Sequence, residues 1–121
     1  MRVIGLIVLL GGLLVAAPAQ AFPVMSCWNG TGQDWLDRPA KCTYSTNGTT
    51  AKLVTLKWRN WGRSTATASG LRRTSRSRYR TTVQVRGLMQ CGDTATYYQE
   101  LRFKRRNARF SKWLPLTVPR C

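Results

Sequence analysis

The residues best suited to chemistry in this sequence are its arginines, five of which lie within the ten residues Leu71–Arg80. The planar guanidinium group presents its N–H donors as a fork that matches the oxygens of phosphate and carboxylate groups. The whole chain carries 20 Lys and Arg against 4 Asp and Glu, a net charge of +16, which is far more than solubility requires. The sequence therefore predicts recognition of anionic groups.

We expect the arginine-rich segment to share one surface with a second basic stretch, because hairpin pairing would bring the two together. Like charges opposite each other in a sheet destabilise it, and a bound polyanion would relieve that cost. The predicted polyanion-binding residues are Arg72, Arg73, Arg76, Arg78, Arg80, Arg102, Lys104, Arg105 and Arg106. The alternative is that an exported protein simply tolerates arginine and that the charge is incidental.

Residues for catalysis are scarce. The chain has no His for general acid–base work, and its cysteines are better explained as disulfides than as nucleophiles. A paired-carboxylate or two-metal mechanism would need nearly all of its 4 acidic residues. Asp34 and Asp37 could contribute to weak calcium binding, but such residues more often cap a turn, and Glu100 is expected to pair with arginines. We therefore expect no enzyme, no metal site and no cofactor.

Aromatic residues are interleaved with arginines at Trp58, Arg59, Trp61 and Arg63, as in surfaces that bind single-stranded nucleic acid. A small domain also needs large side chains to fill its core. The sequence favours the core for Trp58. For Trp61, which is next to a glycine in a turn, core and surface are both open.

Strands must position these side chains, because alternation of apolar and polar residues dominates the middle of the chain. One strand is predicted from the apolar residues that recur at every second position, namely Val54, Leu56 and Trp58. The small and β-branched run 64–69 predicts a second strand that packs closely. Asn47-Gly48 predicts a hairpin turn between strands over 42–46 and 49–58.

A second hairpin is predicted about Cys91-Gly92-Asp93, with odd positions paired to odd positions between 78–88 and 94–104. Its more apolar face comprises Tyr79, Thr81, Val83, Val85, Tyr97, Gln99, Leu101 and Phe103. Its outer face comprises Arg78, Arg80, Thr82, Gln84, Arg86, Tyr98, Glu100, Arg102 and Lys104.

Other segments lack this periodicity. Residues 22–41 are predicted to form a loop whose core contacts are Trp28, Trp35 and Leu36, and the first half of 71–80 an exposed loop. Residues 113–119 contain two prolines, which suit an extended or edge segment. No long stretch has helical periodicity, so the predicted fold class is all-β: a small disulfide-stabilised sandwich or open barrel of antiparallel hairpins.

Residues 1–21 have the pattern of a signal peptide, with Arg2, an apolar stretch and the small-residue end Ala19-Gln20-Ala21. We therefore expect a single secreted or cell-envelope domain over 22–121, with no membrane span after cleavage. Its net charge would be +15, from 19 cations without Arg2 and 4 carboxylates. An even number of cysteines in an exported chain predicts disulfides, for which we favour the local pairings Cys27–Cys42 and Cys91–Cys121 among three possible connectivities.

Several short motifs give a family resemblance: Trp58-Arg59-Asn60-Trp61-Gly62, Ala66-Thr67-Ala68-Ser69-Gly70, Cys91-Gly92 and Tyr97-Tyr98 after a signal peptide. With these, the chain resembles small exported proteins of actinobacteria, or phage-like proteins of actinobacteria, of unassigned function. The resemblance covers 53–103 and departs from the pattern in the arginine-rich 72–80. It implies export and a β-fold, and it implies no catalytic residues.

The leading hypothesis from the sequence is an exported cationic β-domain that binds an anionic polymer, either nucleic acid or an envelope polyanion. One alternative is a secreted toxin or antimicrobial that acts on membranes or nucleic acid, which an exposed apolar patch beside the arginines would favour. The other is a structural or interaction protein whose charge is incidental. Neither the ligand nor the oligomeric state follows from the residues.

Overall fold

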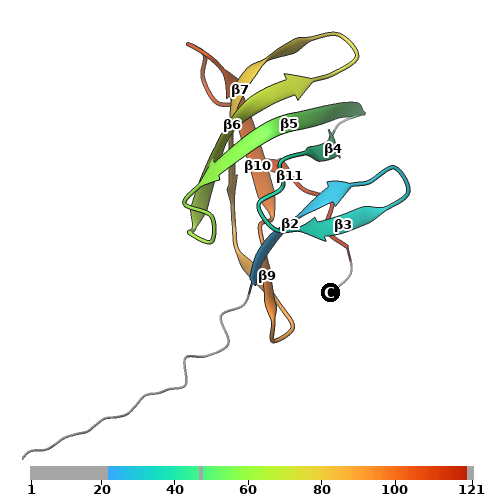
Figure 1. The fold of residues 1–121 in the computed structure, drawn as a ribbon, viewed down its shortest axis with the longest axis vertical. Helices are drawn as coiled ribbons and strands as arrows, with labels where there is room; N and C mark the ends of the chain where they lie inside the picture. Colours follow the sequence, from blue (N-terminus) through green and yellow to red (C-terminus); the bar gives the residue numbers. More distant parts are fainter. Residues whose placement is uncertain (1–21, 47, 120–121) are drawn as a thin grey trace, which may run out of the picture.

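The computed structural model describes residues 22–46 and 48–119, and every regular element in them is a β-strand (Figure 1). The predicted signal peptide lies outside these residues, and within them no helix is long and apolar enough to span a membrane. The strands are β2 (Phe22–Trp28), β3 (Gln33–Leu36), β4 (Cys42–Thr46), β5 (Thr49–Arg59), β6 (Thr65–Arg73), β7 (Arg78–Arg86), β8 (Met89–Cys91), β9 (Ala95–Tyr97), β10 (Glu100–Arg105) and β11 (Leu114–Pro115).

The strands form one sheet in the order β11-β10-β7-β6-β5-β4-β2-β9-β8, with β3 paired to β2. All pairs are antiparallel except β2 with β9. The sheet curls into a half-barrel around its core (Figure 1), which confirms the all-β, open-barrel prediction. The predicted hairpin of β4 and β5 is also confirmed.

A β-bulge bends β5 and helps the sheet to curl. The register of β5 against β6 shifts after Val54, at Thr55, whose φ is 53°. Gly70 lies opposite on β6, where a Cβ would come within 2.6 Å of the Val54 carbonyl oxygen, so glycine is required. The predicted alternation is therefore wrong here, because Leu53 and Leu56 are both buried while Val54 lies on the other side of the sheet.

The small and β-branched run that predicted a strand lies in β6, which confirms that strand. Ala66 and Ala68 are buried opposite Val85 and Val83 of β7. These residues belong to one core inside the curl, which also contains Met25, Leu53, Tyr98, Leu101, Leu114 and Leu116. The core lies entirely on the concave side, so the convex side of these strands is free for polar residues.

The hairpin about Cys91-Gly92-Asp93 is confirmed with its odd-to-odd register. Val85 of β7 pairs with Leu101 of β10, and both are fully buried. The same register continues at the tip, where Cys91 of β8 pairs with Ala95 of β9. Two residues on each side, 87–88 and 98–99, separate the pair Arg86–Glu100 from the pair Met89–Tyr97, so the hairpin is broken near its middle.

Tyr98 lies at this break, and its predicted outward orientation is wrong. It is fully buried, and its ring packs against Trp61 with centroids 5.2 Å apart. The Tyr98 hydroxyl accepts a hydrogen bond from the Gly62 N–H (2.8 Å) and donates one to the Arg63 carbonyl (2.7 Å). Burial raises the pKa of this phenol above its ordinary value. Tyr98 thus connects the β5–β6 turn to the second hairpin.

Residues 22–41 contain two strands, which corrects the predicted loop. The sequence of β2 shows no alternation because Met25, Ser26 and Cys27 are all buried, with Gln33 accepting a hydrogen bond from the Ser26 hydroxyl. Strands covered on both faces lose the two-residue period. Leu36 packs against the core as expected, whereas Trp28 is 43% exposed and does not belong to it.

The segment after β10 is extended, as its prolines suggested. Leu114 pairs with Leu101, so β11 forms an edge of the sheet. Leu114 and Leu116 are buried, and they extend the core beyond β10.

The disulfide Cys27–Cys42 joins β2 to β4, as predicted. Cys121 lies outside the described residues, so the Cys91–Cys121 bridge stays a prediction. Peptide mapping of the protein without reduction is expected to recover one peptide pair linked through each bridge. A peptide pair linked through Cys27 and Cys121 would contradict this assignment.

Replacing Tyr98 with Phe is expected to lower the free energy of unfolding by about 1 to 3 kcal/mol, since the Gly62 N–H and the Arg63 carbonyl would lose their partner. Urea unfolding measures this loss. The control is Tyr97→Phe, because the Tyr97 hydroxyl takes part in none of the side-chain hydrogen bonds found among the described residues. An equal loss in both variants would refute the role of Tyr98.

The raised pKa of Tyr98 also gives stability a pH dependence. The native state favours the neutral phenol, so its contribution is complete below the unfolded-state pKa of about 10.0 and is lost as pH rises through the higher native pKa. The Tyr98→Phe variant is therefore expected to lose less stability than the wild type between neutral and strongly alkaline pH.

Candidate functional site

The side chains that point away from the core on β5, β6, β7 and β10 form a basic surface, which we call the outer face. Their common side follows from the strand register, since directly paired residues share a face. The cations of the outer face are Lys52, Lys57, Arg59, Arg73, Arg78, Arg80, Arg86, Arg102 and Lys104. Glu100 is the only carboxylate on these four strands, and it is bound to Arg86 at 2.9 Å.

Like charges lie directly opposite each other at one end of the outer face. Lys52 pairs with Arg73, and Arg73 pairs with Arg78. Paired residues in a sheet have their Cβ atoms about 5 Å apart, so these three cations repel one another. No ion pair among the described residues involves any of them.

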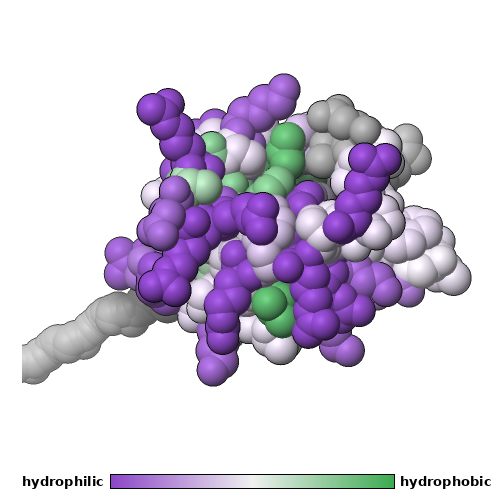
Figure 2. All heavy atoms as spheres, turned by 90° about the horizontal axis from the view of Figure 1, so that it is seen from above, coloured by the Kyte–Doolittle hydropathy of each residue, from purple (hydrophilic) through white to green (hydrophobic). Residues whose placement is uncertain are grey.

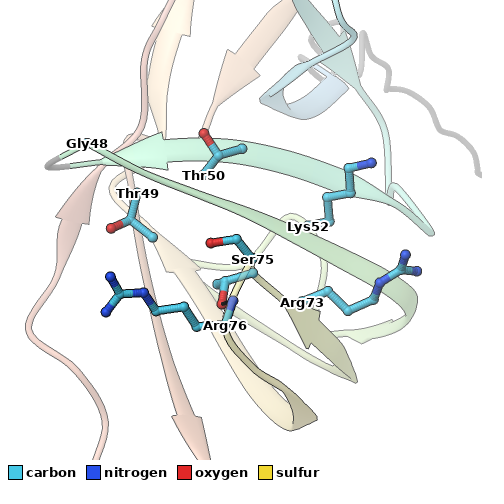
Figure 3. Close-up of a pocket in the computed structure, with 8 residues that line it drawn as sticks. Gly48, Thr49, Thr50, Lys52, Arg73, Ser75 and Arg76 are labelled. Atoms are coloured by element: carbon cyan, nitrogen blue, oxygen red, sulfur yellow. Dashed lines mark hydrogen bonds between the residues drawn. The ribbon is translucent and has the colours of Figure 1, made fainter.

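An open hollow of about 820 Å³ lies beside this row, between the β4–β5 turn and the β6–β7 loop. In Figure 3, Lys52 and Arg73 extend in similar directions from neighbouring strands, and Arg76 lies on the opposite side of the hollow. Thr49, Thr50 and Ser75 also line the hollow and add hydroxyl groups to it (Figure 3). The lining offers many hydrogen-bond donors and no carboxylate.

The β6–β7 loop that carries Arg76 is held in a defined turn. The Thr74 N–H donates to the Ser77 carbonyl (2.9 Å), and the Thr74 hydroxyl accepts from the N–H groups of Arg76 (3.2 Å) and Ser77 (3.1 Å). The loop therefore presents Arg76 to the hollow from a structured backbone.

A second hollow, of about 350 Å³, lies at the same end of the strands. It is lined by Arg80, Lys104 and Arg106. The structure therefore places seven of the nine predicted residues on the outer face or in its hollows: Arg73, Arg76, Arg78, Arg80, Arg102, Lys104 and Arg106.

Arg72 is a correction, because it lies in β6 on the core side and not in an exposed loop. It is only 9% exposed. Its Nε donates to the Tyr44 hydroxyl and its Nη1 to the Tyr79 hydroxyl, each at 3.2 Å, and its Cζ lies 4.0 Å from the centroid of the Phe103 ring. Arg105 also points to this side and stacks on Tyr79 at 4.3 Å. Both arginines thus contact aromatic rings instead of the outer face.

Tyrosines take the place of a counter-carboxylate around Arg72. Burial raises the pKa of Tyr44, although its bond to Arg72 acts in the opposite direction. The phenol consequently stays neutral and serves as a hydrogen-bond acceptor for the guanidinium. This arrangement gives Arg72 a structural role.

The predicted platform at Trp58 and Trp61 is not an open surface. Both rings pack against the core, the Trp58 indole N–H donates to the Pro39 carbonyl (2.8 Å), and the Trp61 indole N–H donates to the Pro23 carbonyl (3.1 Å). The prediction of Trp58 as a core residue is therefore confirmed, and Trp61 also contacts the core.

Aromatic rings do contact cations elsewhere, in a group that the sequence did not indicate. Trp113 lies 4.1 Å from the Cζ of Arg86 and 4.4 Å from that of Arg102. Phe110 lies 4.3 Å from the Cζ of Arg102 and 5.3 Å from the Nζ of Lys104. The pairing of β11 with β10 brings Phe110 and Trp113, which precede β11, close to the cations of β7 and β10. The only sequence signal for these contacts is the presence of two aromatic residues just before β11.

Two acidic residues outside the outer face, Asp34 and Asp37, have local partners. Asp34 accepts a hydrogen bond from the Asn29 side chain (2.9 Å), and Asp37 pairs with Arg38 (3.3 Å). Within 22–46 and 48–119, no three potential metal ligands gather in one place.

Comparison of the chain with protein-family models, with curated proteins and with solved structures gives no match. Inference of function therefore depends on the chemistry of the outer face.

Neighbouring Arg72 and Arg73 provide a test of this division between structural and surface arginines. Arg72→Ala is expected to lower the free energy of unfolding by about 2 to 4 kcal/mol, since it removes a buried side chain with its charged hydrogen bonds. Arg73→Ala, on the exposed side, is expected to change it by less than about 0.5 kcal/mol. Urea unfolding compares the two, and similar losses would contradict the assignment.

Proposed function

We propose that this chain is an exported cationic β-domain that binds anionic polymers, nucleic acid or an envelope polyanion, through its outer face. The observation that carries the proposal is the presence of nine cations and one carboxylate, already paired with Arg86, on four neighbouring strands. When such cations neutralise the phosphates of a polyanion, the counterions condensed on the polyanion are released, and this release favours binding.

The repulsion within the sheet supports the proposal further. Lys52, Arg73 and Arg78 face each other without a carboxylate, so the unbound protein carries an electrostatic cost. Phosphate or sulfate groups placed among them would turn this cost into attraction. Seen from above (Figure 2), hydrophilic side chains project over most of the visible face, and hydrophobic atoms show only in small separate places.

Membrane insertion is supported less well. The large apolar side chains that are exposed among the described residues are Phe22, Trp28 and Met89, and none belongs to β5, β6, β7 or β10. An apolar patch among the arginines, which membrane action would use, does not occur on those four strands. Export is supported by the Cys27–Cys42 bridge, since disulfides persist in oxidising compartments, and by the sequence pattern of 1–21.

Affinity for a polyanion is expected to fall steeply with salt. For about five phosphate contacts on duplex DNA, the slope of log K against log salt should be about −4 to −5, with little dependence on base sequence. The double variant Arg73→Gln/Arg78→Gln should reduce the magnitude of this slope by about 2. Fluorescence anisotropy across a salt series measures it.

The matched control is Arg38→Gln/Arg63→Gln, which removes the same charge from two loops outside the outer face. Its slope should stay close to that of the wild type. Equal effects of the two double variants would mean that net charge alone drives binding, and no binding to any polyanion at low salt would rule out the proposed function.

A further inference from the structure

We propose that the polymer is a single-stranded nucleic acid, with an unpaired base stacked on Trp28 and its neighbouring phosphates in the hollow beside Lys52, Arg73 and Arg76. This inference rests on the proposed function and specifies its ligand. It starts from Trp28, which is 43% exposed although its strand, β2, lies inside the sheet and not at an edge. Among the described residues, no ring or cation contact involves Trp28.

The strand register places Trp28 in line with the cations of the outer face. Trp28 pairs with Thr43, Thr43 with Lys52, Lys52 with Arg73, and Arg73 with Arg78. Directly paired residues share a face, so an aromatic ring, a hydroxyl and three cations form one row across five strands. Neighbouring strands are about 4.8 Å apart, and the row is therefore about 19 Å long.

Two adjoining hollows follow this row. One is lined by Trp28, Gln33, Ser45 and Thr50 and has a volume of about 270 Å³. Sites that enclose a drug-sized ligand measure roughly 300 to 1,000 Å³, so this hollow suits a single ring. Thr50 also lines the larger basic hollow (Figure 3), so a group bound over Trp28 lies next to the cations. A ring followed by a phosphate is the repeating unit of a nucleic acid strand.

Hydrogen-bonding capacity favours a phosphate polymer over a glycan. Sugar hydroxyls need acceptors as well as donors. Here the hydroxyls of Ser45 and Thr50 bond each other (2.8 Å), and the Gln33 carbonyl oxygen already accepts from Ser26 (2.8 Å). These bonds use part of the acceptor capacity of the hollow, whereas the N–H donors of the Gln33 amide and of the neighbouring cations stay free to match phosphate oxygens.

The shape of the surface favours a single strand over a duplex. The core fills the concave side of the curl, so the outer face is convex (Figure 1). A rigid duplex touches a convex surface over a short length, whereas a flexible strand can follow it. Stacking on Trp28 also requires a base that is not already stacked within a duplex, and aromatic side chains bind such bases with little sequence preference.

The other margin of the outer face has the same chemistry. Trp113 and Phe110 lie against the guanidinium groups of Arg86 and Arg102 beyond β10. Rings and guanidinium planes both accept stacked bases. The basic strands thus have an aromatic contact at each side.

The test compares oligothymidine with a duplex of equal length and with inorganic polyphosphate, at one low salt concentration, by anisotropy and competition. The wild type should bind oligothymidine more tightly than the duplex at equal phosphate concentration. Trp28→Ala should weaken oligothymidine binding about tenfold and leave polyphosphate binding unchanged. Trp28→Phe should retain most of the affinity, because it keeps a ring.

Phe22→Ala is the matched control, since Phe22 is an aromatic residue of the same strand, is 68% exposed and lies outside the row. Phe22→Ala should leave the affinities for oligothymidine and polyphosphate unchanged. An unchanged affinity of Trp28→Ala for oligothymidine, or an equal loss for polyphosphate, would overturn the inference while leaving polyanion binding intact. Heparin, a sulfated glycan, is a further probe. If Trp28→Ala lowered the affinity for heparin more than the affinity for oligothymidine, the inference would also be overturned, in favour of a glycan. Absence of binding to all of these polymers would instead refute the proposed function itself.

Discussion

The close approach of β5 to β6 at Gly70 is the constraint on which the remainder of the structure depends. A strand without a bulge cannot bury both Leu53 and Leu56, because residues three apart point to opposite faces. The bulge at Thr55 reverses the alternation, and it fits only because Gly70 has no Cβ to meet the β5 backbone. The same reversal keeps the lysines before and after it, Lys52 and Lys57, on the outer face. Core and basic surface are therefore consequences of one local distortion.

Much of the fold could be predicted from alternation, and the errors have specific physical causes. The second hairpin was found because its core face and its charged face are both regular. In contrast, alternation does not reveal β2, because the consecutive residues Met25 to Cys27 are all buried. It also predicts the wrong side for Tyr98, because Tyr98 lies between β9 and β10, where the strand is interrupted and the alternation need not continue. The inward position of Arg72 depends on Tyr44 and Tyr79, which come from two other strands. Local sequence contains no information on such contacts.

The candidate site also depends on contacts between strands that local sequence does not contain. Clustered arginines indicate an anionic ligand, but their chemistry depends on the face to which each belongs, and adjacent residues of a strand belong to opposite faces. Arg73 faces solvent among like charges, whereas Arg72 is enclosed by aromatic rings. The row that contains Trp28 could not be found from the sequence at all, since it joins residues of five strands through their register.

The position of the disulfide links this row to the redox state of the surroundings. β2 meets β4 through one register pair, Trp28 with Thr43, and the Cys27–Cys42 bridge lies immediately beside it. β2 is also held by its pairing with β3 and β9. Reduction would therefore weaken only the junction between β2 and β4, while the cations on β5, β6 and β7 would keep their own extensive pairing. Without the bridge, Trp28 would be aligned less firmly with the cations of the row. The bridge thus fixes the position of the ring relative to the charge, and an oxidising environment favours the complete row.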